Sequence, residues 1–176
     1  MVWARTKLLI WGYIFEPIKD MRISYVGPKP EQFYKKLNEL MRTVFNVPDA
    51  YVQEKNYSWE KTKDGEKFEV DWEVNKILDT YSYIVCEISL KGFSANGEGK
   101  AVIRLKPRLI TEYPQDTIWQ QNIMYEMVRR MWHNMFYQHK RMEYLNLGKE
   151  LLTSMESSVK HFGGTLREGA SQPQGQ

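Results

Sequence analysis

The sequence predicts an α+β domain in which an antiparallel sheet packs against a long C-terminal helix, in the order ββ-α-ββββ-α. Two short hairpin turns, Asp64-Gly65 and Asn96-Gly97, lie among alternating apolar residues. Apolar residues at helical spacing occupy residues 30–46, and a second, longer helical pattern spans about 116–162. A sheet with one apolar face needs cover, and these two helices are the cover that the chain offers.

Composition favours a folded domain with a sizeable core. Hydrophobic residues make up 42 % and aromatic residues 14 % of the 176 residues, which is too apolar for a disordered chain. The formal net charge of +3 is too small to indicate nucleic-acid binding by itself. Cys86 is the single cysteine, so no internal disulfide can form, and we expect a cytoplasmic location. We expect one domain over residues 1–163 and a disordered tail over residues 164–176.

The N-terminus combines basic and apolar residues. Arg5 and Lys7 precede an apolar run at residues 8–15, but Glu16-Pro17 follows without a small-residue cleavage site. This run is too short to cross a bilayer, which takes about 20 residues. We therefore expect no transmembrane span and favour a buried strand, with a membrane-surface anchor as the alternative.

A second strand, a helix and a meander follow. The strand at residues 22–26 stops at Gly27-Pro28-Lys29-Pro30, and proline is well tolerated in the first turn of the helix at residues 30–46. Residues 51–113 then predict four antiparallel strands.

Turn chemistry predicts the register of the meander. If both hairpins have two-residue loops at the Asp-Gly and Asn-Gly pairs, Tyr57 opposes Trp72 and Leu90 opposes Ile103. Even-numbered apolar residues on the two middle strands share a face, so the loop near Asp79-Thr80 should contain an odd number of residues, or a bulge should interrupt one strand. Pro107 has no N–H to donate, which predicts that the last strand lies at an edge or is bulged there.

The long helical pattern is the least ordinary feature. Asp116 is a candidate N-cap and Gly163-Gly164 a candidate C-cap, and one straight helix between them would be about 70 Å long. A domain of this size has a radius of gyration of only about 16 Å. We expect a break at Gly148, with the earlier half on the meander. The later half either folds back on the first elements, which we favour, or projects to a partner.

The order of elements resembles the helix-grip fold of START-like and polyketide-cyclase-like proteins. The resemblance covers about residues 21–147: a strand that leads through Gly27-Pro28-Lys29-Pro30 into a helix, a meander, and a long helix. It implies a sheet curled around the last helix, with space between them for a hydrophobic ligand. The chain departs from the family in its four-stranded meander, its extra N-terminal strand and its overlong last helix.

Catalytic motifs are not evident. His133 and His139 are six residues apart, which places them on different faces of a helix, and His161 lies farther away. Cys86 falls among inward-facing residues of a strand, which indicates an inert buried thiol. We predict no catalytic residue, metal or cofactor, and the sequence does not favour an enzyme.

Three surfaces remain as candidates. The favoured function is a binding module that holds a hydrophobic ligand or partner protein in an apolar groove between sheet and helix. Its predicted lining is Tyr57, Trp59, Phe68, Trp72, Trp119, Met131, Trp132 and Met135.

The second candidate is an RNA-associated or ribosome-associated protein, because basic residues alternate with aromatic ones on the long helix. Its predicted contacts are Lys100, Arg104, Lys106, Arg108, Arg130, Tyr137, Lys140 and Arg141. The third candidate is a homo-oligomer joined through the end of the long helix. Its predicted interface is Leu151, Leu152, Met155 and Val159.

Overall fold

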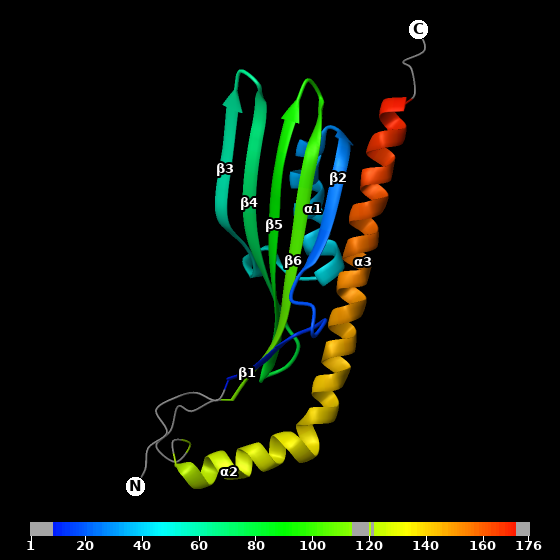
Figure 1. Cartoon of the computed structure of the whole chain (residues 1–176). Coiled ribbons are helices and arrows are strands. Elements are labelled where there is room, and N and C mark those ends of the chain that lie inside the picture. Colours follow the sequence, from blue (N-terminus) through cyan, green and yellow to red (C-terminus); the bar gives the residue numbers. More distant parts are fainter. Residues whose placement is uncertain (1–8, 114–119, 121, 172–176) are drawn as a thin grey trace.

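The structure, a computed structural model, describes residues 9–113, 120 and 122–171. It is an α+β fold in the predicted order: a six-stranded antiparallel sheet, one helix after the second strand, and a long C-terminal helix (Figure 1). The strands are β1 (Leu9–Tyr13), β2 (Met21–Pro28), β3 (Val52–Thr62), β4 (Gly65–Ile77), β5 (Ser82–Ala95) and β6 (Glu98–Glu112). The helices are α1 (Phe33–Phe45), α2 (Ile123–Trp132) and α3 (Gln138–Ser171), with short helical turns η1 (Pro30–Gln32), η2 (Asp49–Tyr51) and η4 (His133–Tyr137).

The sheet order is β3-β4-β5-β6, with β1 and β2 both pairing with the far side of β6. β6 is therefore an inner strand, and the predicted edge position is wrong. Along this side of β6, pairing with β2 ends at Leu105 and pairing with β1 starts at Arg108. Pro107 lies in the gap between the two partner strands, so its missing N–H removes no hydrogen bond to either.

The second hairpin has the predicted register, with Leu90 opposite Ile103. Asn96 and Gly97 both have positive φ, which a tight two-residue hairpin turn requires. The last pair between β4 and β5 is Ile77 with Tyr83, which leaves five residues between them, an odd number as predicted, and Val74 accordingly pairs with Cys86.

The predicted register of the first hairpin is wrong by two residues. Tyr57 pairs with Val70, because Thr62 pairs with Gly65 and the loop is Lys63-Asp64. A two-residue shift keeps every side chain on its face, so the alternation of apolar residues could not reveal it.

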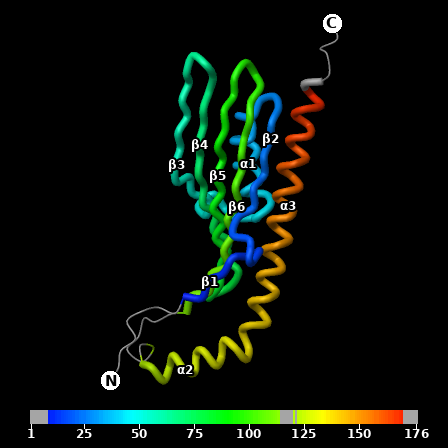
Figure 2. The backbone as a smooth tube through the Cα atoms, viewed as in Figure 1, coloured from blue at the N-terminus to red at the C-terminus, as the bar shows by residue number. Residues whose placement is uncertain are grey.

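The core fills one face of the sheet. Alternate residues of β4, β5 and β6 point into it, and α1 covers them with one face, including Phe33, Leu37 and Met41. The second half of α3 covers the rest: Leu152, Met155 and Val159 are at most 1 % exposed. The later half of the long helix therefore folds back on β2 and α1, the outcome favoured from the sequence, and Figure 2 shows α3 running beside β2.

The predicted break at Gly148 and the predicted end at Gly163-Gly164 are both wrong. α3 runs without interruption through these glycines to Ser171, so residues 164–171 of the predicted tail are helical. Gly148 serves close approach instead, because a Cβ there would lie 2.6 Å from Cδ1 of the buried Ile14. The bend occurs at η4, a π-helical turn that connects α2 to α3. The axis of α2 makes a sharp angle with that of α3 (Figure 1).

The N-terminal run forms a strand that is only partly buried. Leu9 and Trp11 of β1 are 46 % and 52 % exposed, which corrects the expectation of a fully buried strand. Among the described residues, no helix has the length and apolar content needed to span a membrane.

Candidate interaction surface

The outer side of α2 and η4 is apolar and open to solvent. Of the 17 large hydrophobic side chains that are prominently exposed in the described part of the chain, nine lie within residues 123–142, each 52–65 % exposed. They are Ile123, Met124, Met127, Val128, Met131, Trp132, Met135, Phe136 and Met142. We call this set the outer face; its concentration on one bent helical segment distinguishes it from scattered surface residues.

The inner side of the same segment is polar and buried. Arg129 is 4 % exposed, forms an ion pair with Glu126 at 3.0 Å, and lies over the ring of Tyr113 at 5.7 Å. His133 shares a hydrogen bond of 2.8 Å between its Nδ1 and the Tyr113 hydroxyl. A helix on the surface of a soluble protein normally turns its apolar side to the core. Here that orientation is reversed.

Asp79, in the loop between β4 and β5, joins the helical bend to the sheet. Its Oδ2 accepts hydrogen bonds from the hydroxyls of Tyr137 and Tyr144 at 2.8 and 2.9 Å. Its Oδ1 accepts the backbone N–H groups of Tyr81 and Ser82 at 2.8 and 2.7 Å. Both oxygens are therefore engaged, one by the loop and one by the helix. We call this arrangement the Asp79 clamp.

A second set of hydrogen bonds extends the clamp across the sheet. The Tyr137 hydroxyl is also 2.7 Å from Oγ of Ser82, which is itself 2.8 Å from Oγ1 of Thr111. Arg141 donates from Nη1 to Thr111 Oγ1 at 2.7 Å and to the carbonyl of Ile10 at 3.3 Å. The bend is thus tied to β1, β5 and β6 as well as to the loop.

The protonation states of the clamp follow from burial and hydrogen bonding. Burial alone would raise the pKa of Asp79, but hydrogen bonds from Tyr81, Tyr137, Tyr144 and Ser82 outweigh it and lower that pKa below its usual value. Burial, helped by the nearby Arg141 charge, lowers the pKa of His133. Near pH 7 His133 is therefore neutral, and Asp79 is ionised, the form that accepts hydrogen bonds at both oxygens.

The predicted groove residues do not line one groove. Phe68 and Trp72 are buried in the core, at 1 % and 2 % exposure, while Tyr57 is 53 % exposed on β3. The helix members Met131, Trp132 and Met135 belong to the outer face, away from this aromatic group. Trp119 lies outside the described residues. The prediction fails because α1 and the second half of α3 already cover the apolar face of the sheet.

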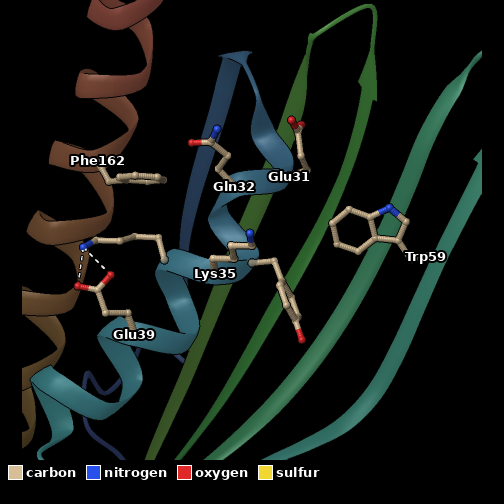
Figure 3. A pocket seen from close by; sticks show the side chains of 8 residues that line it. Glu31, Gln32, Lys35, Glu39, Trp59 and Phe162 are labelled. Carbon is tan, nitrogen blue, oxygen red and sulfur yellow. Dashed lines mark hydrogen bonds and ion pairs between the residues drawn. The ribbon is translucent and has the colours of Figure 1, made fainter.

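Trp59 instead borders an open hollow of about 530 Å³ beside α1 (Figure 3). Tyr34 and Phe162 supply further aromatic surface, and Glu31, Gln32, Lys35, Lys36 and Glu39 complete its lining. Lys36 is paired with Glu39 at 2.9 Å, and the Trp59 indole N–H donates to Glu66 at 3.1 Å. Two acidic and two basic side chains balance in this hollow, so its charge selects no particular ligand.

Half of the eight predicted nucleic-acid contacts interact with other residues of the described chain. Tyr137 is 7 % exposed and so cannot stack on a base, and Arg141 is committed to the sheet. Arg108 pairs with Glu87, and Lys140 lies 3.7 Å from Asp79 Oδ2. Lys100, Lys106 and Arg130 remain exposed, and Arg104 is half-buried.

The predicted oligomer interface is core rather than surface. Leu152, Met155 and Val159 are buried against β2 and α1, and Leu151 is half-buried beside them. The second half of the long apolar stripe is therefore core, as favoured from the sequence, whereas the first half, which was expected to pack on the meander, is exposed.

The Asp79 clamp is the feature that sequence reasoning missed. Tyr137 and Tyr144 lie 58 and 65 positions from Asp79, so no local motif joins them. Their seven-residue spacing does place both tyrosines on one helix face, with Arg141 between them. The same basic and aromatic pattern predicts an RNA contact, although it is equally suited to an acidic loop of the same chain.

Function is inferred here from the residues and contacts of this chain. No family model matches this chain, and comparison with curated proteins likewise gave no match.

Proposed function

We propose that this chain is a non-catalytic cytoplasmic interaction module that binds a protein partner on the outer face of α2 and η4. The observation that supports this most is the reversed polarity of the helix, with Arg129, His133 and Tyr137 inward and the apolar stripe outward. The clamp fixes the polar side against the sheet, so the apolar side has no route to the chain's own core.

The size of the outer face supports docking over chance exposure. A large side chain carries roughly 200 Å² of accessible surface. Nine such side chains, each a little over half exposed, therefore present on the order of 900 Å². The largest apolar patch on a typical monomer is about 300–600 Å².

The side chains of the outer face suit a protein surface. Five of the nine are methionine, which is flexible and polarisable and fits partners of irregular shape. An apolar helix face of this kind is also what helix-in-groove and helix-on-helix recognition uses. The buried Cys86, whose pKa burial raises to about 12, fits a cytoplasmic protein without a reactive thiol.

Methionine oxidation tests whether a protein covers the outer face. We expect Met124, Met127, Met131 and Met135 to be oxidised about fivefold less in cells of the source organism than in dilute purified chain, because a docked partner removes their exposure. Mass spectrometry after a brief peroxide pulse gives each sulfoxide fraction. Met41 and Met155, both 0 % exposed, are internal controls that should stay protected in both samples. Equal oxidation of the outer face in both samples would contradict the proposal.

A further inference from the structure

We infer that the partner on the outer face is a second copy of this chain, bound helix against helix about a two-fold axis. The inference rests on the proposed function and names the occupant of the same surface. Three properties of α2 and η4 carry it: the area of the outer face, its lack of charge, and the position of the basic residues around it.

The area matches what a stable dimer requires. The outer face presents on the order of 900 Å² per copy, and a standard protein–protein interface buries about 800 Å² on each partner. One outer face packed on its equivalent therefore completes an interface of standard size without help from another element.

The outer face can pair with itself without electrostatic repulsion. In a two-fold interface the same patch meets itself, so a cluster of like charges near the axis would oppose association. Among residues 122–137, Arg130 is the one exposed residue that carries a charge, and Asn134 is polar. The other exposed residues in this range are apolar, the partly exposed Glu126 is paired with Arg129, and the exposed His139 and Lys140 lie beside Met142 at the end of the outer face.

The basic residues are placed poorly for a lipid surface. Helices that lie on membranes carry lysine and arginine on an exposed polar side, from which they reach the headgroups. On α2 and η4 that side is turned inward, with Arg129 and His133 buried against Tyr113. A bilayer in contact with the outer face would meet Arg130 and little other positive charge from this segment.

A substitution in the middle of the outer face should weaken self-association without lowering the stability of the monomer. Met131 is 57 % exposed, so Met131→Glu leaves the monomer folded but places a carboxylate and its equivalent in a dry interface. We expect the dimer dissociation constant to rise about 100-fold or more. Val26 is 69 % exposed and pairs with Lys100, close to the turn between β5 and β6. Figure 1 shows this turn at the end of the sheet remote from α2, so Val26→Glu is the matched control.

Sedimentation of the full chain over a wide concentration range is the test. We expect wild type and Val26→Glu to reach twice the chain mass of 21.0 kDa, while Met131→Glu stays monomeric with an unchanged circular dichroism spectrum. A dimer that Met131→Glu leaves intact would overturn the inference, because another surface would then hold it.

The remaining outcomes distinguish the inference from the proposed function. A wild-type monomer at every concentration, with methionines protected in cells, would refute the second copy and leave another protein as the partner. A monomer whose methionines become protected only when lipid vesicles are added would refute both in favour of a membrane surface. A monomer unprotected in cells would also refute both.

Discussion

At the scale of single residues, Asp79 decides which way the bent helix faces. Its carboxylate holds Tyr137 and Tyr144 against the loop between β4 and β5, and Arg141 holds the next helical turn against β1 and β6. Once these polar groups face inward, helical geometry sends Met131 and Met135 outward. The exposed apolar side is thus a consequence of where the polar side finds its hydrogen bonds.

The pKa of Asp79 gives this clamp a pH dependence. A carboxyl whose folded pKa is lowered stabilises the fold above its unfolded pKa of about 3.9, and this stabilisation is lost as the pH falls through the folded value. We expect Asp79→Asn to cost about 1–3 kcal/mol of unfolding free energy at pH 7, because a charged acceptor of several hydrogen bonds is replaced by a neutral one.

Urea unfolding at pH 7 and at pH 3 measures this effect. The difference between wild type and Asp79→Asn should shrink at pH 3, where the wild-type carboxyl begins to gain its proton. Asp49→Asn is the control: this carboxylate is 77 % exposed, and its loss should change stability by less than about 0.5 kcal/mol. A difference between wild type and Asp79→Asn that is the same at both pH values would contradict the account.

At the scale of elements, the apolar stripe of the long helix is exposed in its first half and buried in its second half. The spacing of the apolar residues correctly predicts a helix, yet spacing alone cannot show which element covers an apolar face. The apolar face of the sheet has room for α1 and for the second half of α3, and nothing in the described residues remains to cover α2.

Matched substitutions compare the two halves. We expect Met155→Ala to cost about 2–5 kcal/mol, because Met155 is fully buried and its loss leaves a cavity. Met135→Ala, at a side chain that is 65 % exposed, should cost less than about 0.5 kcal/mol. Chemical denaturation at low protein concentration, where self-association is absent, gives both values. Equal losses for the two variants would show that the halves are not divided between core and surface in this way.

The sheet shows what sequence can and cannot predict at this scale. Element order and the faces of the strands follow from alternation and turn residues, and Asn96-Gly97 sets the second register because both residues adopt positive φ. The first register differs by two residues, since the ladder closes with Thr62 opposite Gly65 and not with Lys63 opposite Glu66. The Asp79 clamp and the exposure of the outer face depend on contacts between distant segments, which no local pattern contains.

At the scale of the whole molecule, the fold has a packed body and a projecting arm. The sheet, α1 and the second half of α3 share one core, whereas α2 extends from one end of the molecule with its apolar side outward (Figure 1). Burial of the outer face in a two-fold dimer would give the molecule the usual arrangement of apolar groups inside and polar groups outside. Two outer faces are therefore expected to pack against each other.

The distance between spin labels on two copies of the chain tests whether their outer faces pack together. Arg130 lies at the rim of the outer face, so Arg130→Cys allows one spin label per chain, while buried Cys86 stays unreactive. Pulsed electron paramagnetic resonance should give a narrow distance distribution below about 30 Å, because packed helices lie about 10 Å apart. Labels at Val26→Cys should be farther apart, since Val26 pairs with Lys100 near the turn between β5 and β6, at the end of the sheet away from α2. No measurable distance between Arg130→Cys labels, or a shorter one between Val26→Cys labels, would contradict the account.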